Sequence, residues 1–351
     1  MASPPSRRAV LASSLALAAC GATARGSAAT PAAPLKSAAP FPVGTCVQSA
    51  QLDDPAFAAL LEMQVSQIVP EWEMKMEYIA QPAGAFRFDA PDRIAAFARD
   101  RRLRLFCTAL VWYAEKPDAF VHLDESRISF RDAFANYVAA VVGRYRGQAV
   151  GWDVVNEPIV DDGSAWRDSL WAQKLGAFEH MRLAFQLARQ ADPGAVLFLN
   201  DYNLERLPKK RATFMRLAEQ LLKAGAPLNG LGTQTHVNAD LAPGQITAAI
   251  KDLASLGLAI RVSEMDVSIV RARGLLTSDD DLIQRQAALY VEAADAFSSL
   301  PARQRFDFTF WGLRDPESWL VRENASDTPL PFDAESHPKP LIGAWEAALR
   351  R

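Results

Sequence analysis

The chain has 351 residues, of which half are hydrophobic and 23% are charged, and its formal net charge at pH 7 is −3. Lysine and arginine are spread along the chain, so no basic patch indicates nucleic acid or a membrane surface as a partner. The composition is that of a globular protein, and the length would accommodate one (β/α)8 barrel, which takes about 250 residues or more.

Residues 1–40 have the composition of an export signal followed by a tether. A serine and two arginines at positions 6–8 precede an apolar run over residues 9–20, which is too short to span a membrane. The paired arginines resemble a twin-arginine signal, and the string that ends at Cys20 resembles a lipoprotein box, which would place a lipid anchor on that cysteine. Residues 21–40 are rich in alanine and proline. We therefore expect an exported protein, periplasmic or extracellular, with lipidation of Cys20 left open.

From residue 41 to the end of the chain, apolar strand-like segments alternate with helical segments. The expected strands cover residues 41–47, 65–69, 103–112, 150–155, 196–199, 228–236, 258–267 and 306–311. The first expected helix begins at residues 53–55. Further helices are expected over residues 130–145, 171–189, 211–223, 246–256, 282–297 and 341–349.

This alternation predicts the fold. Strands that alternate with helices form parallel βαβ units, and eight such units predict a closed (β/α)8 TIM barrel as a single domain over residues 41–351. A doubly wound open sheet is the alternative. Such a sheet would carry a glycine-rich phosphate turn after its first strand, and the residues at 43–45 do not supply one.

Two cysteines lie within the predicted barrel, both in apolar strand-like segments. Cys46 and Cys107 are therefore expected to be buried free thiols, and a disulfide in an oxidising compartment is the alternative. The four histidines are scattered, and no spacing of cysteine and histidine resembles a zinc site. We expect neither a metal nor an organic cofactor.

Two of the predicted strands end in a glutamate. The fourth strand continues into Asn156, Glu157 and a proline, and the seventh continues into a Ser-Glu-Met-Asp sequence that contains Glu264. The carboxyl ends of barrel strands meet at one rim, where active sites of this fold lie. Two facing carboxyl groups can cleave a glycosidic bond if one protonates the leaving oxygen and the other attacks the sugar carbon. A solvated charge or a salt bridge would equally explain either glutamate alone.

These motifs, with three more in the same order, resemble glycoside hydrolase family 10, the β-1,4-xylanases. The Trp-Asp-Val-Val-Asn-Glu sequence that ends at Glu157 is similar to the acid/base motif of that family, and Glu264 stands at the position of its nucleophile. The other motifs are Asn-Asp-Tyr-Asn at 200–203, Gly-Thr-Gln-Thr-His at 232–236 and Phe-Trp-Gly-Leu at 310–313. The resemblance covers residues 41–351. It implies a retaining endo-1,4-β-xylanase that acts on xylan. Separately from the resemblance, we expect a monomer without a nucleic-acid partner.

The resemblance also implies roles for residues around the two glutamates. Asn156 would hydrogen-bond the 2-hydroxyl of the sugar at the cleavage point, a bond that strengthens in the transition state. His236 and Asp266 would hold and tune Glu264, with Gln234 near it.

Further residues at matching family positions would bind the substrate. Trp311 and Trp319 would form apolar walls against the faces of the sugars. Glu71, Lys75 and Trp112 stand at positions that the family keeps, after the second and third strands.

Three positions depart from the family pattern on the non-reducing side of the cleavage point. Trp72 replaces an asparagine that binds the next sugar outward, Thr108 replaces a histidine of the central subsite, and Glu115 replaces a glutamine farther out. Each lost buried hydrogen bond to the substrate costs on the order of 1–3 kcal/mol. We therefore expect lower activity on plain xylan and a preference for a decorated or short substrate.

Two other functions remain open at this stage. One is a different β-glycosidase on the same barrel, such as a cellobiosidase. The other is a carbohydrate-binding barrel without catalysis, which would have no reason to keep both Glu157 and Glu264.

Overall fold

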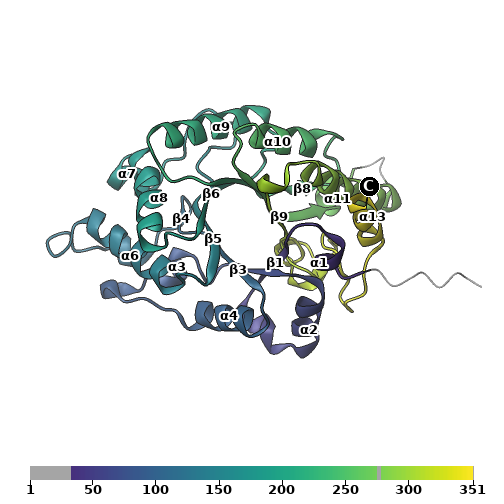
Figure 1. Ribbon diagram of the computed structural model, residues 1–351, viewed down its shortest axis with the longest axis horizontal. Helices are drawn as coiled ribbons and strands as arrows, with labels where there is room; N and C mark the ends of the chain where they lie inside the picture. Colours follow the sequence, from purple (N-terminus) through teal and green to yellow (C-terminus); the bar gives the residue numbers. More distant parts are fainter. Residues whose placement is uncertain (1–32, 275–277, 351) are drawn as a thin grey trace, which may run out of the picture. The chain divides into compact units, whose positions relative to one another are not determined.

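The computed structural model describes residues 33–274 and 278–350, and its central feature is a closed ring of eight parallel strands (Figure 1). Each strand of the ring pairs with the next in chain order, and β10 returns to pair with β1. Two short strands continue the ring toward the rim, where β4 pairs with β5 and β8 pairs with β9. The ring consists of β1 (Val43–Val47), β2 (Gln67–Pro70), β3 (Arg104–Cys107), β5 (Ala149–Asn156), β6 (Val196–Asp201), β7 (Gly230–Thr233), β9 (Ala259–Ser268) and β10 (Arg305–Phe310), and the two short strands are β4 (Val111–Trp112) and β8 (His236–Asn238).

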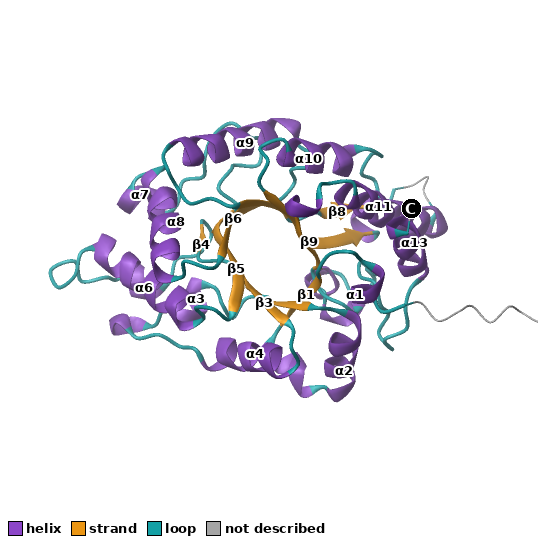
Figure 2. Cartoon of the chain, in the orientation of Figure 1, coloured by secondary structure: helices purple, strands orange, loops and turns teal. Residues whose placement is uncertain are grey.

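The long helices surround the strands and cover the outer face of the barrel, and several short helices lie in the connecting loops (Figure 2). They are α1 (Leu35–Ala38), α2 (Pro55–Gln64), α3 (Met76–Ile79), α4 (Asp89–Asp100), α5 (Asp118–Val121), α6 (Phe130–Arg144), α7 (Leu170–Leu175), α8 (Glu179–Ala191), α9 (Pro208–Lys223), α10 (Gln245–Ala254), α11 (Asp279–Ser298), α12 (Trp319–Glu323) and α13 (Pro340–Leu349). Within the described ranges, none of these helices has both the length and the apolar character needed to cross a bilayer.

The predicted barrel is confirmed, since all eight expected strands are present in the expected order. The predicted start of the first long helix is also confirmed in its chemical detail. Asp54 accepts the backbone N–H of Ala56 at 2.9 Å, and Pro55 occupies the first helical position, where its missing N–H costs nothing.

Three expectations about the elements are wrong in detail. The single helix expected over residues 171–189 is two helices, because Gly176 adopts φ 94° and ends α7 before α8 begins. The helix α4 was not expected, although its apolar residues face the barrel at helical spacing. The strands expected over 103–112 and 228–236 are each divided into two short strands, and Thr235, with φ 57°, interrupts the second of them.

Packing against the barrel begins before residue 41, the predicted start of the domain. Leu35 is buried, its N–H donates to the side chain of Gln64 at 3.0 Å, and α1 packs against α13. The packed domain therefore includes at least part of the segment expected to be a tether. The expected export signal and Cys20 lie outside the described residues.

Glycines inside the barrel make room for larger neighbours. A Cβ atom at Gly230 would lie 2.1 Å from the ring of Phe198, and one at Gly232 would lie 2.2 Å from Oδ1 of Asn200. Both separations are far below van der Waals contact. Any side chain at these two positions would displace the residue that fills the space.

A buried ion pair network crosses the interior of the barrel. Nη1 of Arg261, on β9, lies 2.8 Å from Oδ2 of Asp153 on β5, and its Nε lies 3.2 Å from Oδ1 of Asp307 on β10. The guanidinium also stacks on Phe106 at 3.5 Å. All three charged side chains are about 1% exposed or less. Burial raises the pKa of Asp153 to about 6, although Arg261 opposes that rise.

We predict that Arg261→Met lowers the free energy of unfolding by about 3–5 kcal/mol, because it leaves two buried carboxylates without their cation. Urea denaturation would measure the change. The control is Arg273→Met, whose pair with Asp279 is 40% and 62% exposed and whose loss should cost less than about 1 kcal/mol. Equal destabilisation by both substitutions would contradict the prediction.

Candidate active site

A cleft of about 430 Å³ lies among the loops that follow the strands, within the usual size of small-molecule sites. Nine of the eleven predicted site residues line it: Glu71, Lys75, Trp112, Glu157, Gln234, His236, Glu264, Trp311 and Trp319. Trp72, Tyr202, Asn203 and Arg271 complete the lining. Asn156 and Asp266 lie behind it and contact residues that line it. The sequence therefore identified most of this cleft.

Glu157 directly follows β5, and three neutral N–H groups hold its carboxyl group. Trp112 Nε1 donates to Oε2 at 2.8 Å, while Gln234 Nε2 and Asn156 Nδ2 donate to Oε1 at 2.9 and 3.2 Å. The backbone N–H donates to the carbonyl of Asn200 at 2.8 Å. The carboxyl group is thereby fixed at the floor of the cleft with 9% of the residue exposed.

Glu264 lies within β9, and the amide of Asn200 connects it to the opposite side of the site. Nδ2 of Asn200 donates both to Oε1 of Glu264 and to Oδ1 of Asn156, each at 2.9 Å. Oδ1 of Asn200 accepts from Ser263 Oγ at 2.8 Å, which fixes the orientation of the amide. Since Asn156 also donates to Glu157, one chain of side-chain hydrogen bonds links the two glutamates.

His236 bridges Glu264 and Asp266. Its Nε2 lies 3.3 Å from Oε2 of Glu264, and its Nδ1 lies 2.9 Å from Oδ2 of Asp266. Trp319 Nε1 also donates to that oxygen of Asp266, at 2.8 Å. Burial lowers the pKa of His236, but the two carboxylates outweigh it and raise the pKa to about 10. The imidazole is therefore a cation at neutral pH, held between two anions.

Glu71 and Lys75 lie at the end of the cleft formed by the loop after β2. Oε2 of Glu71 accepts from Gln48 Nε2 at 2.9 Å, and Oε1 pairs with Arg322 from α12. The ammonium of Lys75 lies 4.7 Å from the centre of the Trp112 ring, a cation–π contact. Lys75 has no carboxylate partner within the described ranges.

Two of the three positions that depart from the family pattern are not in the cleft. Thr108 is 2% exposed and lies in the barrel interior, where it helps to lower the pKa of Asp153 against the effect of burial. Glu115 is also 2% exposed, and it accepts the backbone N–H of Glu77 at 3.0 Å. Burial raises the pKa of Glu115 to about 8. Of the three, only Trp72 is positioned to touch a ligand.

Three of the six described non-glycine residues with positive φ lie at the rim. Glu157, Asn203 and Thr235 have φ values of 56°, 57° and 57°, in the left-handed region that residues other than glycine rarely adopt. Each follows or interrupts a different strand of the ring. Such conformations cost of order 1–3 kcal/mol each and gather at functional sites, where the surrounding structure maintains them.

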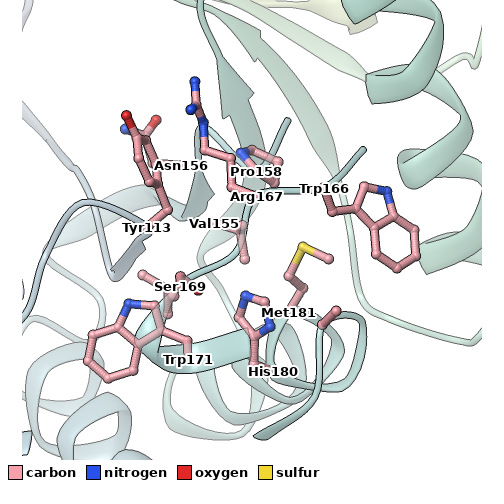
Figure 3. A pocket seen from close by; sticks show the side chains of 12 residues that line it. Tyr113, Val155, Asn156, Pro158, Trp166, Arg167, Ser169, Trp171, His180 and Met181 are labelled. Atoms are coloured by element: carbon pink, nitrogen blue, oxygen red, sulfur yellow. The ribbon is translucent and has the colours of Figure 1, made fainter. Parts of the chain in front are cut away.

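A second, much smaller cavity lies behind the β5 end, between Tyr113, Arg167 and His180 (Figure 3). Its volume of about 10 Å³ has room for no more than one water molecule, so it cannot hold a sugar. Arg167 stacks on the ring of Tyr113 at 4.1 Å and donates to the hydroxyl of Tyr202 at 2.7 Å. This packing supports the wall of the main cleft from behind.

The expectation of buried free thiols is confirmed. Cys46 and Cys107 are both buried and unpaired, and burial raises the pKa of each thiol well above its usual range. Within the described ranges, the only histidine–carboxylate group close enough to share a metal ion is that of Asp333, Glu335 and His337, which lies outside the cleft.

Arg271 is the lining residue that sequence reasoning missed entirely. It follows β9 in a short 3-10 turn, stacks on the Trp319 ring at 4.8 Å and pairs with Glu323. The sequence feature that could have identified Arg271 as a cleft residue is its position beyond the end of a strand, seven residues after Glu264. The Asn-Asp-Tyr-Asn motif at 200–203 also does not reveal that Asn200 links the two glutamates through hydrogen bonds.

We predict that the imidazole of His236 remains doubly protonated up to about pH 10. Because this pKa exceeds the ordinary value of 6.5, the charged imidazole stabilises the fold fully below pH 6.5, and that stabilisation is lost as the pH rises through about 10. Nitrogen NMR of the histidine rings would test this, with His180, whose pKa burial lowers, as the internal comparison. Titration of His236 near pH 6.5 would disprove the expectation.

Comparison with known proteins places this chain in one family. Residues 34–348 match the family model of glycosyl hydrolase family 10. The exoglucanase XynX of Acetivibrio thermocellus is 32% identical over 87% of the chain, and the chain spans only 28% of its length. The endo-1,4-beta-xylanase of Geobacillus stearothermophilus is 31% identical over 86% of the chain and 94% of its own length.

Solved structures agree with these sequence matches. The structure of a thermostable mutant of a Cellvibrio japonicus xylanase superimposes with a TM-score of 0.82 at 29% identity, covering 90% of this chain and 100% of that one. The crystal structure of a Paenibacillus barcinonensis xylanase superimposes with a TM-score of 0.80 at 30% identity, covering 90% and 98% of the two chains. The chain therefore belongs to glycosyl hydrolase family 10.

Proposed function

We propose that the protein is a retaining endo-1,4-β-xylanase in which Glu157 is the acid/base and Glu264 is the nucleophile. The observation that carries this proposal is the unequal setting of two glutamates in one cleft. Glu157 is held by neutral N–H donors alone, whereas Glu264 lies beside the positively charged His236. Two carboxyl groups in different environments are what hydrolysis of a glycoside by double displacement requires.

The proposed reaction has two steps. In the first, a carboxylate oxygen of Glu264 attacks the anomeric carbon while Glu157 gives its proton to the departing glycosidic oxygen. In the second, Glu157 takes a proton from water, whose oxygen displaces Glu264 from the anomeric carbon. His236, held by Asp266, keeps the carboxylate of Glu264 oriented through both steps. No metal or organic cofactor takes part.

The substrate is proposed to be xylan, because several relatives and solved neighbours are named endo-1,4-beta-xylanases or xylanases. One relative is named an exoglucanase, which makes β-1,4-glucan the second candidate substrate. The expected preference for a decorated or short chain now depends on Trp72 alone among the three departures. We propose that the protein acts as a monomer.

We predict that Glu264→Ala lowers kcat on xylan by at least about 10³-fold, because the substitution removes the attacking oxygen. Glu157→Ala should lower kcat on xylan by about 10²–10⁴-fold. On a nitrophenyl xylobioside, whose phenolate leaves without being protonated, added azide should restore turnover of Glu157→Ala by replacing the water that needs a base. Product analysis by chromatography would measure both effects. Azide rescue of Glu264→Ala rather than Glu157→Ala, or retention of normal turnover by either variant, would contradict the assignment.

The anomeric form of the first product provides a separate test of the mechanism. Retention gives the β-anomer first, and proton NMR during the first minutes would detect it before mutarotation. Release of the α-anomer first would exclude the covalent step. If no xylo-oligosaccharide appears at all, a panel of β-1,4-glucans becomes the next substrate set.

We further propose that residues 1–40 direct export and that the protein works in the periplasm or outside the cell. The support is the order of the paired arginines at positions 7 and 8, the apolar run and the small residues before Cys20. A lipid on Cys20 would anchor the enzyme.

We predict that Arg7→Lys combined with Arg8→Lys leaves the protein active but retained in the cytoplasm, because a twin-arginine signal needs the pair. Cell fractionation with activity assays would measure this in a bacterial host. Cys20→Ala is the companion variant, and it should remove any lipid label without affecting export. Unchanged export of the double-lysine variant would rule out this route.

A further inference from the structure

The cleft is lined by four tryptophans, and one of them differs from the others. Trp112 and Trp319 donate their indole N–H groups to Glu157 and Asp266. Trp311 is only 7% exposed. Trp72, by contrast, is 44% exposed, and its Nε1 donates to no acceptor within the described ranges. Its ring is therefore free to meet a ligand.

Trp72 is nevertheless held firmly on one side. Its ring meets that of Tyr78 edge to face, with centroids 5.1 Å apart and an interplanar angle of 79°. Tyr78 is itself fixed, because its hydroxyl donates to Asp89 at 3.0 Å and the guanidinium of Arg87 covers its face at 3.6 Å. An exposed ring with a fixed support binds a flat partner at little cost in side-chain entropy.

The position of Trp72 in the cleft indicates which part of a bound glycan it would contact. It follows β2, whereas Tyr202 and Asn203 line the cleft beyond β6, nearly opposite in the ring of strands. Glu157 and Glu264 lie between these two ends. A linear glycan that crosses the cleft through the two glutamates therefore has one of its outer sugars at Trp72.

The carboxylates beside Trp72 are already engaged within the protein, and the ammonium of Lys75 lies against the ring of Trp112, 4.7 Å from its centre. Both carboxylate oxygens of Glu71 are already engaged, by Gln48 and Arg322. Glu115 is turned away and holds the backbone of Glu77. The indole face is the large apolar surface that remains exposed at this end of the cleft.

We infer that Trp72 is a stacking platform for an outer sugar, and that it reads the face of the sugar ring rather than its pattern of hydroxyls. This inference rests on the proposed function, because it assumes that a β-linked glycan occupies the cleft. In a β-linked xylose the 2- and 3-hydroxyls are equatorial and project outward near the plane of the ring, so neither points at the indole that stacks on its face. Substituents on these hydroxyls are therefore tolerated at this subsite.

The first test compares Trp72→Ala, Trp72→Phe and wild type on linear xylo-oligosaccharides of two to six sugars. For chains long enough to reach Trp72, Trp72→Ala should raise KM about tenfold, equivalent to about 1.4 kcal/mol, with kcat changed less than twofold. Shorter chains should be unaffected, and Trp72→Phe should remain near wild type. The matched control is Ile283→Ala, an apolar side chain of α11 that is also 44% exposed and lies outside the cleft.

The second test measures binding without turnover, in the Glu264→Ala background. Calorimetry with xylohexaose and with an arabinose-substituted xylohexaose should show the same tenfold loss when Trp72 becomes alanine. A loss of affinity for the linear ligand alone would show that this subsite recognises the sugar hydroxyls, and it would overturn the inference. So would a KM ratio that stays near one at every chain length, or a Trp72→Phe variant as impaired as Trp72→Ala.

The two tests separate this inference from the proposed function. If wild type cleaves no xylan while the Glu264→Ala protein binds xylohexaose in a Trp72-dependent manner, the hydrolase proposal fails and the stacking platform stands. If xylan is cleaved normally by Trp72→Ala at all chain lengths, the platform fails and the hydrolase proposal stands.

Discussion

The amide of Asn200 is the contact on which the geometry of the site depends. It lies on β6, between the strands that carry the two glutamates, and donates to both Asn156 and Glu264. Its own orientation is set by Ser263, because only one rotation of the amide can accept from that hydroxyl while donating to the carboxylate. A buried, fully paired network of this kind is rigid, so it fixes the carboxyl groups of Glu157 and Glu264 relative to one another.

Charge inside the barrel is arranged in two levels. Arg261 neutralises Asp153 and Asp307 in the interior, and His236 lies between Glu264 and Asp266 at the rim. In both levels one cation is shared by two carboxylates. The net charge of each level is therefore −1, and burial makes any loss of the cation costly. The same device thus stabilises the barrel below and orients Glu264 above.

The sequence was sufficient to predict the barrel and to place Glu157 and Glu264 at its rim, because both predictions depend on short-range patterns. Apolar strands alternate with amphipathic helices, and each glutamate follows a strand end. Other features depend on tertiary contacts that no local pattern encodes. Glu115 stands at a family position for sugar binding, yet its side chain turns inward to the backbone of Glu77. The end of α7 at Gly176 and the position of Arg271 in the cleft likewise depend on the paths of loops.

Gly232 has a consequence for how this barrel can be altered. Replacing glycine by alanine is a common way to stabilise a protein, since it restricts the unfolded chain. At Gly232 the added methyl group would lie 2.2 Å from Oδ1 of Asn200, the atom that fixes the orientation of the amide. Random libraries selected for heat resistance should therefore leave this position unchanged, and protein engineers should treat it as part of the active site although it never meets a substrate.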